Sequence, residues 1–449
     1  MKLERNELSS PNTVLGQLQR GQGRGYLAAR ESNDVDALLH CIHRDPRWDR
    51  QLERRDIYYA RLAMELEVDI RAIAARFDVS FGDHDDELNL TAGVLVELGK
   101  RGVTGAFDAL RAALRSPNWR AAARALSFAQ MDSDKPLVNK ADLSALMVHD
   151  DLRQLVWRDS TWQMWAELEP RLKPLLRQDM GPAHSKARRE AAPKPDTSMS
   201  TVTLLSIVCR ENQVRVSNVL KQRRDAASVA ALVSAGQSGT ESQKRTALMV
   251  LAEQHNPSLI QSCTESVQGD PPPLVRTEIL RYLAALPAEH TLPVARRFQG
   301  RLNLAGVAAA GIFARHAEAE DREALEGELH TLLDKDHLYR VSSVAEALGA
   351  IGNVESADTL RQTFLAVPYA YVRQHLIRAL HICAPAEAIE LAPDALFDSD
   401  EGTRLWATEH VRGRRARERL DEMAADEFEW GYVRKAATKR LAARDSRDL

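Results

Sequence analysis

Apolar residues recur at helical spacing through most of this chain. Val341, Val344, Ala345, Leu348 and Ile351 are spaced i, i+3, i+4, i+7 and i+10, which places them in one stripe along a helix. Two later segments repeat the stripe, at Val372, Leu376, Ala379 and Leu380, and at Val433, Ala436, Ala437 and Leu441. β-branched residues do not alternate with polar ones over any useful length, so no strands are predicted. We therefore expect an all-α protein.

An arginine recurs at a nearly fixed interval in the C-terminal half, at Arg215, Arg245, Arg276, Arg340, Arg373, Arg404 and Arg434. The successive gaps are 30, 31, 64, 33, 31 and 30 residues, and the longest gap equals two units. Its midpoint falls in a segment of small residues, 304–309. A period of this size indicates stacked helical repeats, in which each unit buries its apolar face against its neighbours. We expect an alpha-alpha superhelix.

An acid precedes three of these arginines by six residues. It belongs to the turn between two helices, and the arginine belongs to the first turn of the second helix. The acid can accept backbone N–H bonds at that helix start, or pair with the arginine of its own or the adjacent repeat. Near Arg434, Glu427 and Glu429 flank the equivalent position. We interpret these residues as a structural ladder, made of Asp270, Arg276, Asp334, Arg340, Asp398, Arg404 and Arg434.

This pattern resembles the HEAT repeat, in the short bacterial variety first named after phycobilisome lyases, over residues 201 to about 443. The resemblance implies a helical solenoid whose second helices form a concave surface, and it implies that the aspartate and arginine are structural. The chain departs from the pattern where Cys209, Gly239, Val367 and Phe428 occupy the acid position, and near Gly306, where the arginine is missing. The chain as a whole also resembles uncharacterised HEAT-repeat proteins of bacteria.

One segment, residues 178–200, breaks the helical pattern and contains Gly181, Pro182, Pro193 and Pro195. Such composition is typical of a flexible linker. We therefore predict an irregular helical, HEAT-like domain over 1–177, a linker over 178–200 and a HEAT-like repeat array over 201–449. Within the first domain, residues 102–126 and 34–66 each indicate a helix pair.

Composition excludes several classes of protein. The 449 residues carry a formal net charge of −3, so there is no overall basic excess to bind a phosphate backbone. The four cysteines are scattered without a CxxC pair, which argues against a disulfide framework or a zinc ribbon. The N-terminal residues are polar, and no apolar run approaches the roughly 20 residues that span a bilayer. We expect a cytoplasmic protein that does not interact with membranes.

A search for catalytic and cofactor motifs favours a non-enzymatic protein. There is no GxSxG, no GxxxxGK[ST] and no GxGxxG after a strand, and the absence of any His-Glu dipeptide excludes the di-iron hydroxylase branch of the HEAT family. We interpret the glycine-rich residues 21–25 as a flexible lead into the first helix, His40, Cys41 and His43 as structural, and residues 84–87 as a helix cap. No catalytic, cofactor-binding or metal-binding residue is predicted.

The most economical function is that of a scaffold or adaptor that binds another macromolecule, preferably a protein, through the concave face. Exposed positions of the second helices would contact it, at Glu278, Arg281, Glu346, Gln374, Arg378 and Glu409. The alternative is nucleic-acid binding, including a DNA-glycosylase-like mode, through C-terminal aromatic and basic residues. These are Trp406, Trp430 and Tyr432 with Arg412, Arg414, Arg415, Lys435 and Lys439. The identity of the partner and the oligomeric state stay open.

Overall fold

The computed structural model describes residues 8–44, 53–79, 88–156, 159–176, 192–335 and 337–445, without the side chains of 415, 444 and 445. Within these ranges the regular structure consists of α-helices and short 3-10 turns, with no strand. Local side-chain caps fix several helix starts. At Thr240, for example, the hydroxyl accepts from the backbone N–H of Gln243, whose side chain accepts in return from the N–H of Thr240. The prediction of an all-α protein is confirmed.

The chain forms two compact units. Unit 1 comprises residues 1–179, 365–374 and 388–449, and unit 2 comprises residues 180–364 and 375–387. The C-terminal residues therefore belong with the N-terminal helices, whereas the sequence pattern groups them with the repeats from residue 201. Much of the predicted linker lies outside the described residues. Its last part packs on unit 2, where the Asn212 side chain donates to the carbonyl of Pro193 at 2.9 Å.

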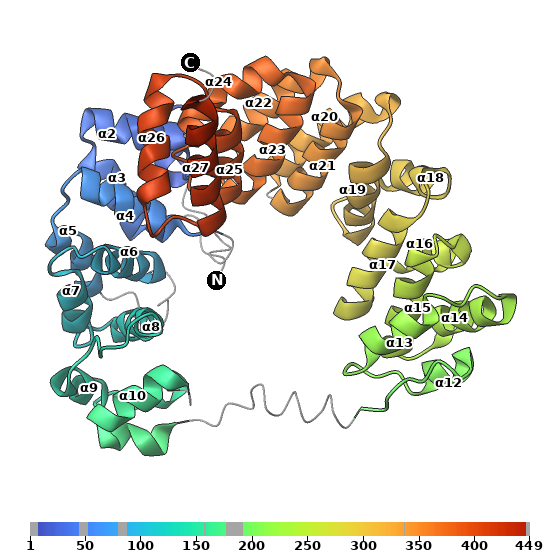
Figure 1. Cartoon of the computed structure of the whole chain (residues 1–449), viewed down its shortest axis with the longest axis horizontal. Coiled ribbons are helices and arrows are strands. Elements are labelled where there is room, and N and C mark those ends of the chain that lie inside the picture. Colours follow the sequence, from blue (N-terminus) through green and yellow to red (C-terminus); the bar gives the residue numbers. More distant parts are fainter. Residues whose placement is uncertain are drawn as a thin grey trace. The chain divides into compact units, whose positions relative to one another are not determined.

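Unit 2 is built of helices that alternate between two layers (Figure 1). Its helices are α12 (Thr201–Ser206), α13 (Gln213–Leu220), α14 (Ala226–Ser238), α15 (Glu241–Glu253), α16 (Ile260–Ser266), α17 (Pro273–Ala285), α18 (Ala288–Phe298), α19 (Leu304–His316), α20 (Arg322–Asp334) and α21 (Leu338–Ile351). Alternate helices pack in sequence, α13 on α15, α15 on α17, α17 on α19 and α19 on α21. The small residues of α19 sit in this layer, where Ala305, Ala308 and Ala309 are buried.

Unit 1 joins helices from both ends of the chain. From the N-terminal side come α1 (Val14–Gln19), α2 (Gly23–Ser32), α3 (Val35–His43), α4 (Arg55–Glu65), α5 (Ile70–Ala74), α6 (Asn89–Lys100), α7 (Ala106–Ala113), α8 (Trp119–Gln130), α9 (Lys140–Leu146) and α10 (Ser160–Leu168). From the C-terminal side come α25 (Glu401–His410), α26 (Arg414–Ala425) and α27 (Gly431–Asp445). The helices α22 (Ala357–Ala366), α23 (Ala370–Cys383) and α24 (Pro385–Ala395) contribute residues to both units. In Figure 1 the blue helices α2 to α4 lie beside the red helices α26 and α27.

Glycines allow the two ends of the chain to approach closely. Gly21 has a left-handed backbone (φ 66°), and its carbonyl accepts from the N–H of Ser399 at 2.9 Å. A Cβ at Gly21 would collide with the Ser399 hydroxyl, and a Cβ at Gly23 would collide with the carbonyl of Asp394. Residues 21–25 are therefore packed against the C-terminal residues, and the prediction of a flexible lead is wrong. Glycine is required here because it has no side chain and so permits the close approach.

Buried charges secure the same contact. The Arg55 guanidinium pairs with Glu53 at 2.5 Å and donates to the carbonyl of Pro368 at 2.8 Å. The other carboxylate oxygen of Glu53 accepts from the N–H of Ala370 at 2.6 Å. Both side chains are buried, so the loop before α23 satisfies polar groups that would otherwise be costly. We call the contact of residues 20–23 and 53–55 with residues 365–373 and 394–400 the terminal clasp.

Two of the recurring arginines pair with carboxylates 25 residues further along the chain. Arg373 contacts Asp398 at 2.9 and 3.0 Å, and Arg404 contacts Glu429 at 2.7 and 3.1 Å. All four side chains are buried. Arg404 also donates to the backbone carbonyl of Asp398, six residues earlier, at 2.7 Å. Arg404 thus reaches the turn before α27, and the carboxylate of Asp398 pairs with Arg373 rather than with Arg404.

The other predicted ladder pairs differ from each other. Arg276 pairs with Asp270, but this carboxylate is 90% exposed. Arg340 is buried and pairs with Glu328, while Asp334 lies exposed at the end of α20. The remaining ladder residue, Arg434, is partly exposed in α27. Among the three predicted pairs, the acid six residues before the arginine forms a side-chain pair with that same arginine only at Asp270, which is exposed.

We predict opposite effects of one substitution at two glycines. Gly23→Ala should lower the free energy of unfolding by about 2 kcal/mol, because the new methyl group meets a backbone carbonyl that cannot move freely. Gly311→Ala should raise it by up to about 1 kcal/mol, because this helical glycine has open space around it. Urea unfolding followed by circular dichroism measures both free energies. Equal changes in the two variants would contradict the close approach of Gly23 to the carbonyl of Asp394.

Replacing two ladder arginines should also have unequal effects. Arg340→Ala leaves the carboxylate of Glu328 buried without a cation, so we expect a loss of about 3–5 kcal/mol. Arg276→Ala removes an exposed pair and should cost less than about 1 kcal/mol. Thermal melting of the two variants tests this, and unchanged melting of Arg340→Ala would rule out its structural role.

Candidate partner-binding groove

A groove runs over α4, α6 and α8 in unit 1. These helices pack in sequence, α4 on α6 and α6 on α8. The groove contains about 970 Å³ of space, counting the solvent at its mouth. Small residues form much of its surface, which gives it depth: Ala92, Gly93, Ala121, Ala125 and Ala129. About 430 Å³ of this space is cavity volume comparable with that of ligand-binding clefts, which lies within their usual range.

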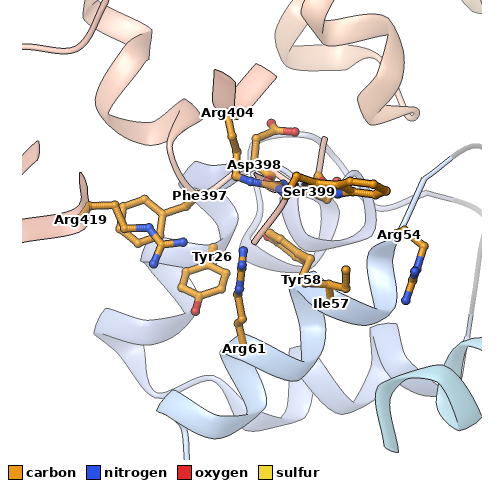
Figure 2. A pocket seen from close by; sticks show the side chains of 11 residues that line it. Tyr26, Arg54, Ile57, Tyr58, Arg61, Phe397, Asp398, Ser399, Arg404 and Arg419 are labelled. Carbon is orange, nitrogen blue, oxygen red and sulfur yellow. Dashed lines mark hydrogen bonds between the residues drawn. The ribbon is translucent and has the colours of Figure 1, made fainter. Parts of the chain in front are cut away.

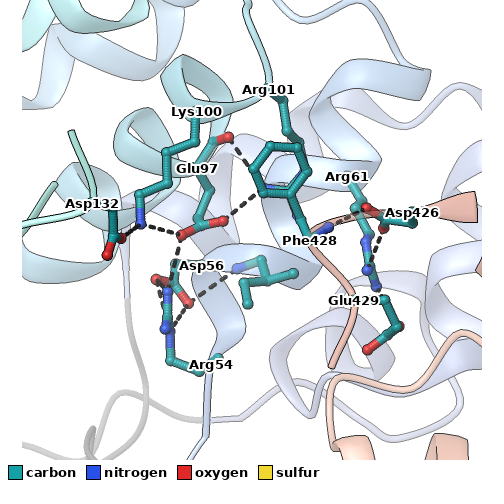
Figure 3. A network of polar contacts seen from close by, with 11 residues as sticks. Arg54, Asp56, Arg61, Glu97, Lys100, Arg101, Asp132, Asp426, Phe428 and Glu429 are labelled. Carbon is teal, nitrogen blue, oxygen red and sulfur yellow. Dashed lines mark hydrogen bonds and ion pairs between the residues drawn. The ribbon is translucent and has the colours of Figure 1, made fainter. Parts of the chain in front are cut away.

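One wall of the groove carries a network of charges (Figure 3). Arg54, Asp56, Glu97, Lys100 and Asp132 line the groove, and Arg101 joins the network behind them. The centre of the network is Glu97, which is buried and accepts from Arg54 at 3.0 Å and from Arg101 at 2.6 Å. Lys100 lies 3.9 Å from Glu97 and 2.7 Å from Asp132. Because three cations face three carboxylates, the network carries no net charge.

The charges on this wall also fix the position of Arg54 at the start of α4. Its guanidinium contacts Asp56 at 2.9 Å as well as Glu97. The hydrogen bond to Asp56, together with both negative charges, raises the pKa of Arg54 above its ordinary value. Arg54 nevertheless remains half exposed. It can therefore contact a bound partner without leaving its place.

The C-terminal turn before α27 supports the far side of the network (Figure 3). Arg61 of α4 pairs with Asp426 at 2.6 Å and with Glu429 at 3.2 Å. The guanidinium of Arg101, at the end of α6, lies 4.5 Å from the centre of the Phe428 ring, a cation–π contact. Residues 426–429 thus tie α4 and α6 together behind the groove.

The opposite wall, formed by α8 and its C-terminal end, carries Arg124 and two exposed apolar side chains. Phe128 is 65% exposed and Met131 is 60% exposed, although both are large hydrophobic side chains. They rise from a helix whose other face is buried and rich in alanine. An exposed aromatic and a flexible thioether beside a cleft are typical of a binding surface.

None of the binding residues predicted from the sequence is among the described residues that line this groove. The buried positions of α8 include Ala122, Leu126 and Ala129, which form a regular helical stripe. Phe128 falls outside that stripe, two residues after Leu126. A helical projection of residues 119–130 would therefore have shown a large hydrophobic residue on the polar side.

A second, smaller pocket lies beside the clasp (Figure 2). Its walls come from both ends of the chain and include Tyr26, Tyr58, Arg61, Asp398, Ser399 and Arg404. The rings of Tyr26 and Tyr58 pack edge to face, with centres 5.5 Å apart. Arg61 and Arg404 both contact Glu429. These side chains already contact one another where the two ends of the chain pack together, so we interpret the pocket as structural.

Carboxylates near the pocket ionise in opposite ways. Burial raises the pKa of Asp400 to about 7, and the neighbouring carboxylate of Asp398 adds to this effect. Burial also opposes ionisation of Glu429, but Arg404 and Arg61 outweigh it and lower its pKa to about 2. Asp400, in the clasp, therefore gains a proton readily, whereas Glu429, outside the clasp, resists protonation.

The predicted second-helix residues differ in exposure. Four are exposed as expected, namely Arg281, Glu346, Arg378 and Glu409. Gln374 is partly buried. Glu278, expected to be exposed, is buried, because Arg245 and Arg281 share its carboxylate at 3.7 and 3.4 Å.

The C-terminal aromatic residues do not form one surface. Trp406 is buried and stacks on His410 with ring centres 4.6 Å apart, so this residue is not available to a partner. Trp430 and Tyr432 are exposed, with ring centres 6.1 Å apart at the start of α27.

The basic residues lie along α27 and around residues 412–414. Arg412, Arg414, Lys435 and Lys439 are exposed, and the side chain of Arg415 lies outside the described set. Arg440 donates to the carbonyl of Val411 at 3.0 Å, so residues 411–414 lie near the C-terminal part of α27. From Tyr432 to Arg440 the helix rises about 12 Å. Arg412, Arg414 and Lys439 therefore lie toward the C-terminal end of α27, whereas Lys435 lies one turn from Tyr432.

The described part of the chain has neither a cluster of metal ligands nor a helix that could span a membrane. Among the described residues, no three His, Cys, Asp or Glu side chains are grouped to hold a metal ion. Cys41 is buried, and the His43 ring lies 3.1 Å from the carbonyl of Ile73. Residues 84–87 lie outside the described ranges. In the described part of the chain, every helix is too short or too polar to cross a bilayer.

We predict that Asp400→Asn stabilises the protein increasingly as the pH rises. The folded protein keeps a proton on Asp400 up to about pH 7, whereas the unfolded chain loses it near pH 3.8, so wild-type stability falls across this range. Asparagine does not titrate, and it can still accept the N–H of Thr403 as the cap of α25. Between pH 5 and pH 8 the advantage of the variant in unfolding free energy should grow by about 2 kcal/mol. Urea unfolding at both pH values measures it, and a constant advantage would contradict the raised pKa.

Comparison with known proteins assigns no function to this geometry. No known protein family and no curated protein matches the chain. The functional interpretation therefore depends on the residues of the groove and of the second helices themselves.

Proposed function

We propose that this chain is a non-enzymatic scaffold of the HEAT-like solenoid type, which binds a helix of a partner protein in the groove over α4, α6 and α8. The observation that supports this most directly is the wall of α8. It places two exposed hydrophobic side chains, Phe128 and Met131, beside a surface of alanines. Water contact with these side chains is unfavourable, and a partner would remove it.

The packing of alternate helices supports the solenoid part of the proposal. In unit 2 the helices α13, α15, α17, α19 and α21 pack one on the next, and in unit 1 α4, α6 and α8 do the same. The groove lies on such a layer. In solenoids of paired helices, the layer of second helices forms an extended surface for binding.

A helix fits the groove better than an extended strand. Small side chains on α6 and α8 permit a close approach, and packed helix axes are about 8–10 Å apart. The groove follows α8, whose 12 residues span about 18 Å, or roughly three turns of a bound helix. An apolar stripe at i, i+3, i+4 and i+7 would contact Phe128 and Met131. Polar residues beside that stripe would reach Arg54 and Asp132.

We predict that filling the groove, or removing its exposed aromatic side chain, weakens partner binding. A display library of amphipathic helical peptides is selected against the full chain, and the affinity of a selected peptide is measured by fluorescence anisotropy. Ala125→Trp fills the floor and Phe128→Ser removes the apolar rim. Each variant should bind at least about tenfold more weakly, equivalent to about 1.4 kcal/mol.

The matched control is Val148→Ser, which removes an apolar side chain that is 75% exposed and does not line the groove. This variant should bind like the wild type. Equal affinity of the wild type and Ala125→Trp would show that the peptide binds elsewhere. Affinity purification from the native host with the same three variants then identifies the natural partner.

A further inference from the structure

The repeated arginine has two different environments. In later repeats it is buried, and Arg340, Arg373 and Arg404 are each less than 5% exposed. In the first three repeats of unit 2, at Arg215, Arg245 and Arg276, it is partly or largely exposed. The same position in the repeat therefore supports the core in one part of the chain and faces solvent in another.

The exposed arginines are less fully paired than the buried ones. Arg245 lies 3.7 Å from Glu278, which it shares with Arg281. Arg276 pairs with Asp270, whose carboxylate is 90% exposed. Within the described residues, Arg215 has no hydrogen bond or ion pair. None of the three therefore has a buried carboxylate to itself.

The three arginines are carried by neighbouring parallel helices. At the ends of α13 and α15, Lys221 pairs with Glu253 at 2.9 Å. At the ends of α15 and α17, His255 lies 2.9 Å from the carbonyl of Ala285. Each arginine belongs to the first two turns of its helix. Because packed helices are about 8–10 Å apart, the outer two arginines are separated by about 20 Å.

Ion pairs use only part of the positive charge of this surface. Arg281 joins the three repeat arginines, and we call these four residues the arginine row. The carboxylates that pair with them are Glu278, which Arg245 and Arg281 share, and Asp270, which pairs with Arg276. Four guanidinium groups thus share two paired carboxylates, and among the described residues no ion pair links the row to Glu211 or Glu241, four residues before Arg215 and Arg245. The row has unused capacity to bind anionic groups.

We propose that the arginine row binds an extended acidic segment of a partner protein across α13, α15 and α17. An extended chain advances about 3.3 Å per residue, so three residues cover the step from one helix to the next. A segment with a carboxylate at every third position therefore places one acid opposite each repeat arginine. The interaction is separate from the groove in unit 1 and does not require it.

The neighbours of the row favour a protein over a nucleic acid. Val214 is 64% exposed and Leu274 is 45% exposed, each within two residues of a row arginine. Aliphatic side chains suit the apolar residues of a peptide, whereas single-stranded nucleic acid is bound by stacking its bases on aromatic rings. The aromatic residue of α17, Tyr282, is fully buried.

The test uses a fluorescein-labelled decapeptide with glutamate at positions 2, 5 and 8 and valine or leucine between them. Its binding to the full chain is followed by fluorescence anisotropy at several salt concentrations. We expect saturable binding that weakens as salt increases, and no binding of the peptide with glutamine at the three positions. The variant in which Arg215, Arg245 and Arg276 are all changed to glutamine should bind at least tenfold more weakly.

Two further variants keep the result interpretable. Arg215→Glu changes only an exposed side chain, so it preserves the fold and should still weaken binding severalfold. Arg297→Gln, at an exposed arginine of α18 outside the row, should bind like the wild type. Wild-type affinity in the triple variant, or no binding of the acidic peptide to the wild type, would overturn the proposal. Tighter binding of a ten-nucleotide oligothymidine, lost in the triple variant, would overturn it in favour of a nucleic acid.

Discussion

The terminal clasp is the contact on which the organisation of unit 1 depends. A side chain at Gly21 would collide with the Ser399 side chain, and one at Gly23 would collide with the backbone of Asp394. Around this contact, Arg55 and Arg373 are buried, and each needs a carboxylate and backbone carbonyls to offset the loss of water. Each arginine takes its carboxylate from its own end of the chain, Glu53 or Asp398. Each also donates to a backbone carbonyl of the opposite end, Arg55 to Pro368 and Arg373 to Gly21. Charges that are costly in isolation therefore make the pairing of the two ends specific.

The groove is a consequence of this contact. The clasp fixes the start of α4, the Arg61 pairs fix its middle, and α6 and α8 pack outward from it. Ion pairs hold the helices close to the clasp. At α8, by contrast, Phe128 and Met131 are exposed. The recurring arginine also differs with its surroundings. It is buried and paired at Arg340, Arg373 and Arg404, and partly or largely exposed at Arg215, Arg245 and Arg276.

Local patterns in the sequence predicted the elements well. The helix pair of α7 and α8 and the apolar stripe of α21 follow directly from residue spacing, because each depends on neighbours within about two turns. The partners of the arginines could not be predicted, because Arg373 and Arg404 pair 25 residues away, across packed helices. Residues 21–25 were misinterpreted for a different reason: glycine is favoured both in mobile segments and where backbones touch, and one sequence cannot distinguish these. Phe128 could have been found from its place on the helix.

The most direct test of this account is to cut the chain between its two halves. A recognition sequence for a specific protease is inserted within residues 178–191, and the cleaved protein is examined by gel filtration and mass spectrometry without denaturant. If the clasp holds the first helices to residues 365–404, the fragments that carry residues 8–176 and 192–445 elute together as one complex, and they separate only in urea. Independent elution of the two fragments in native buffer would contradict the account, since it would show two domains connected by nothing more than the segment between them.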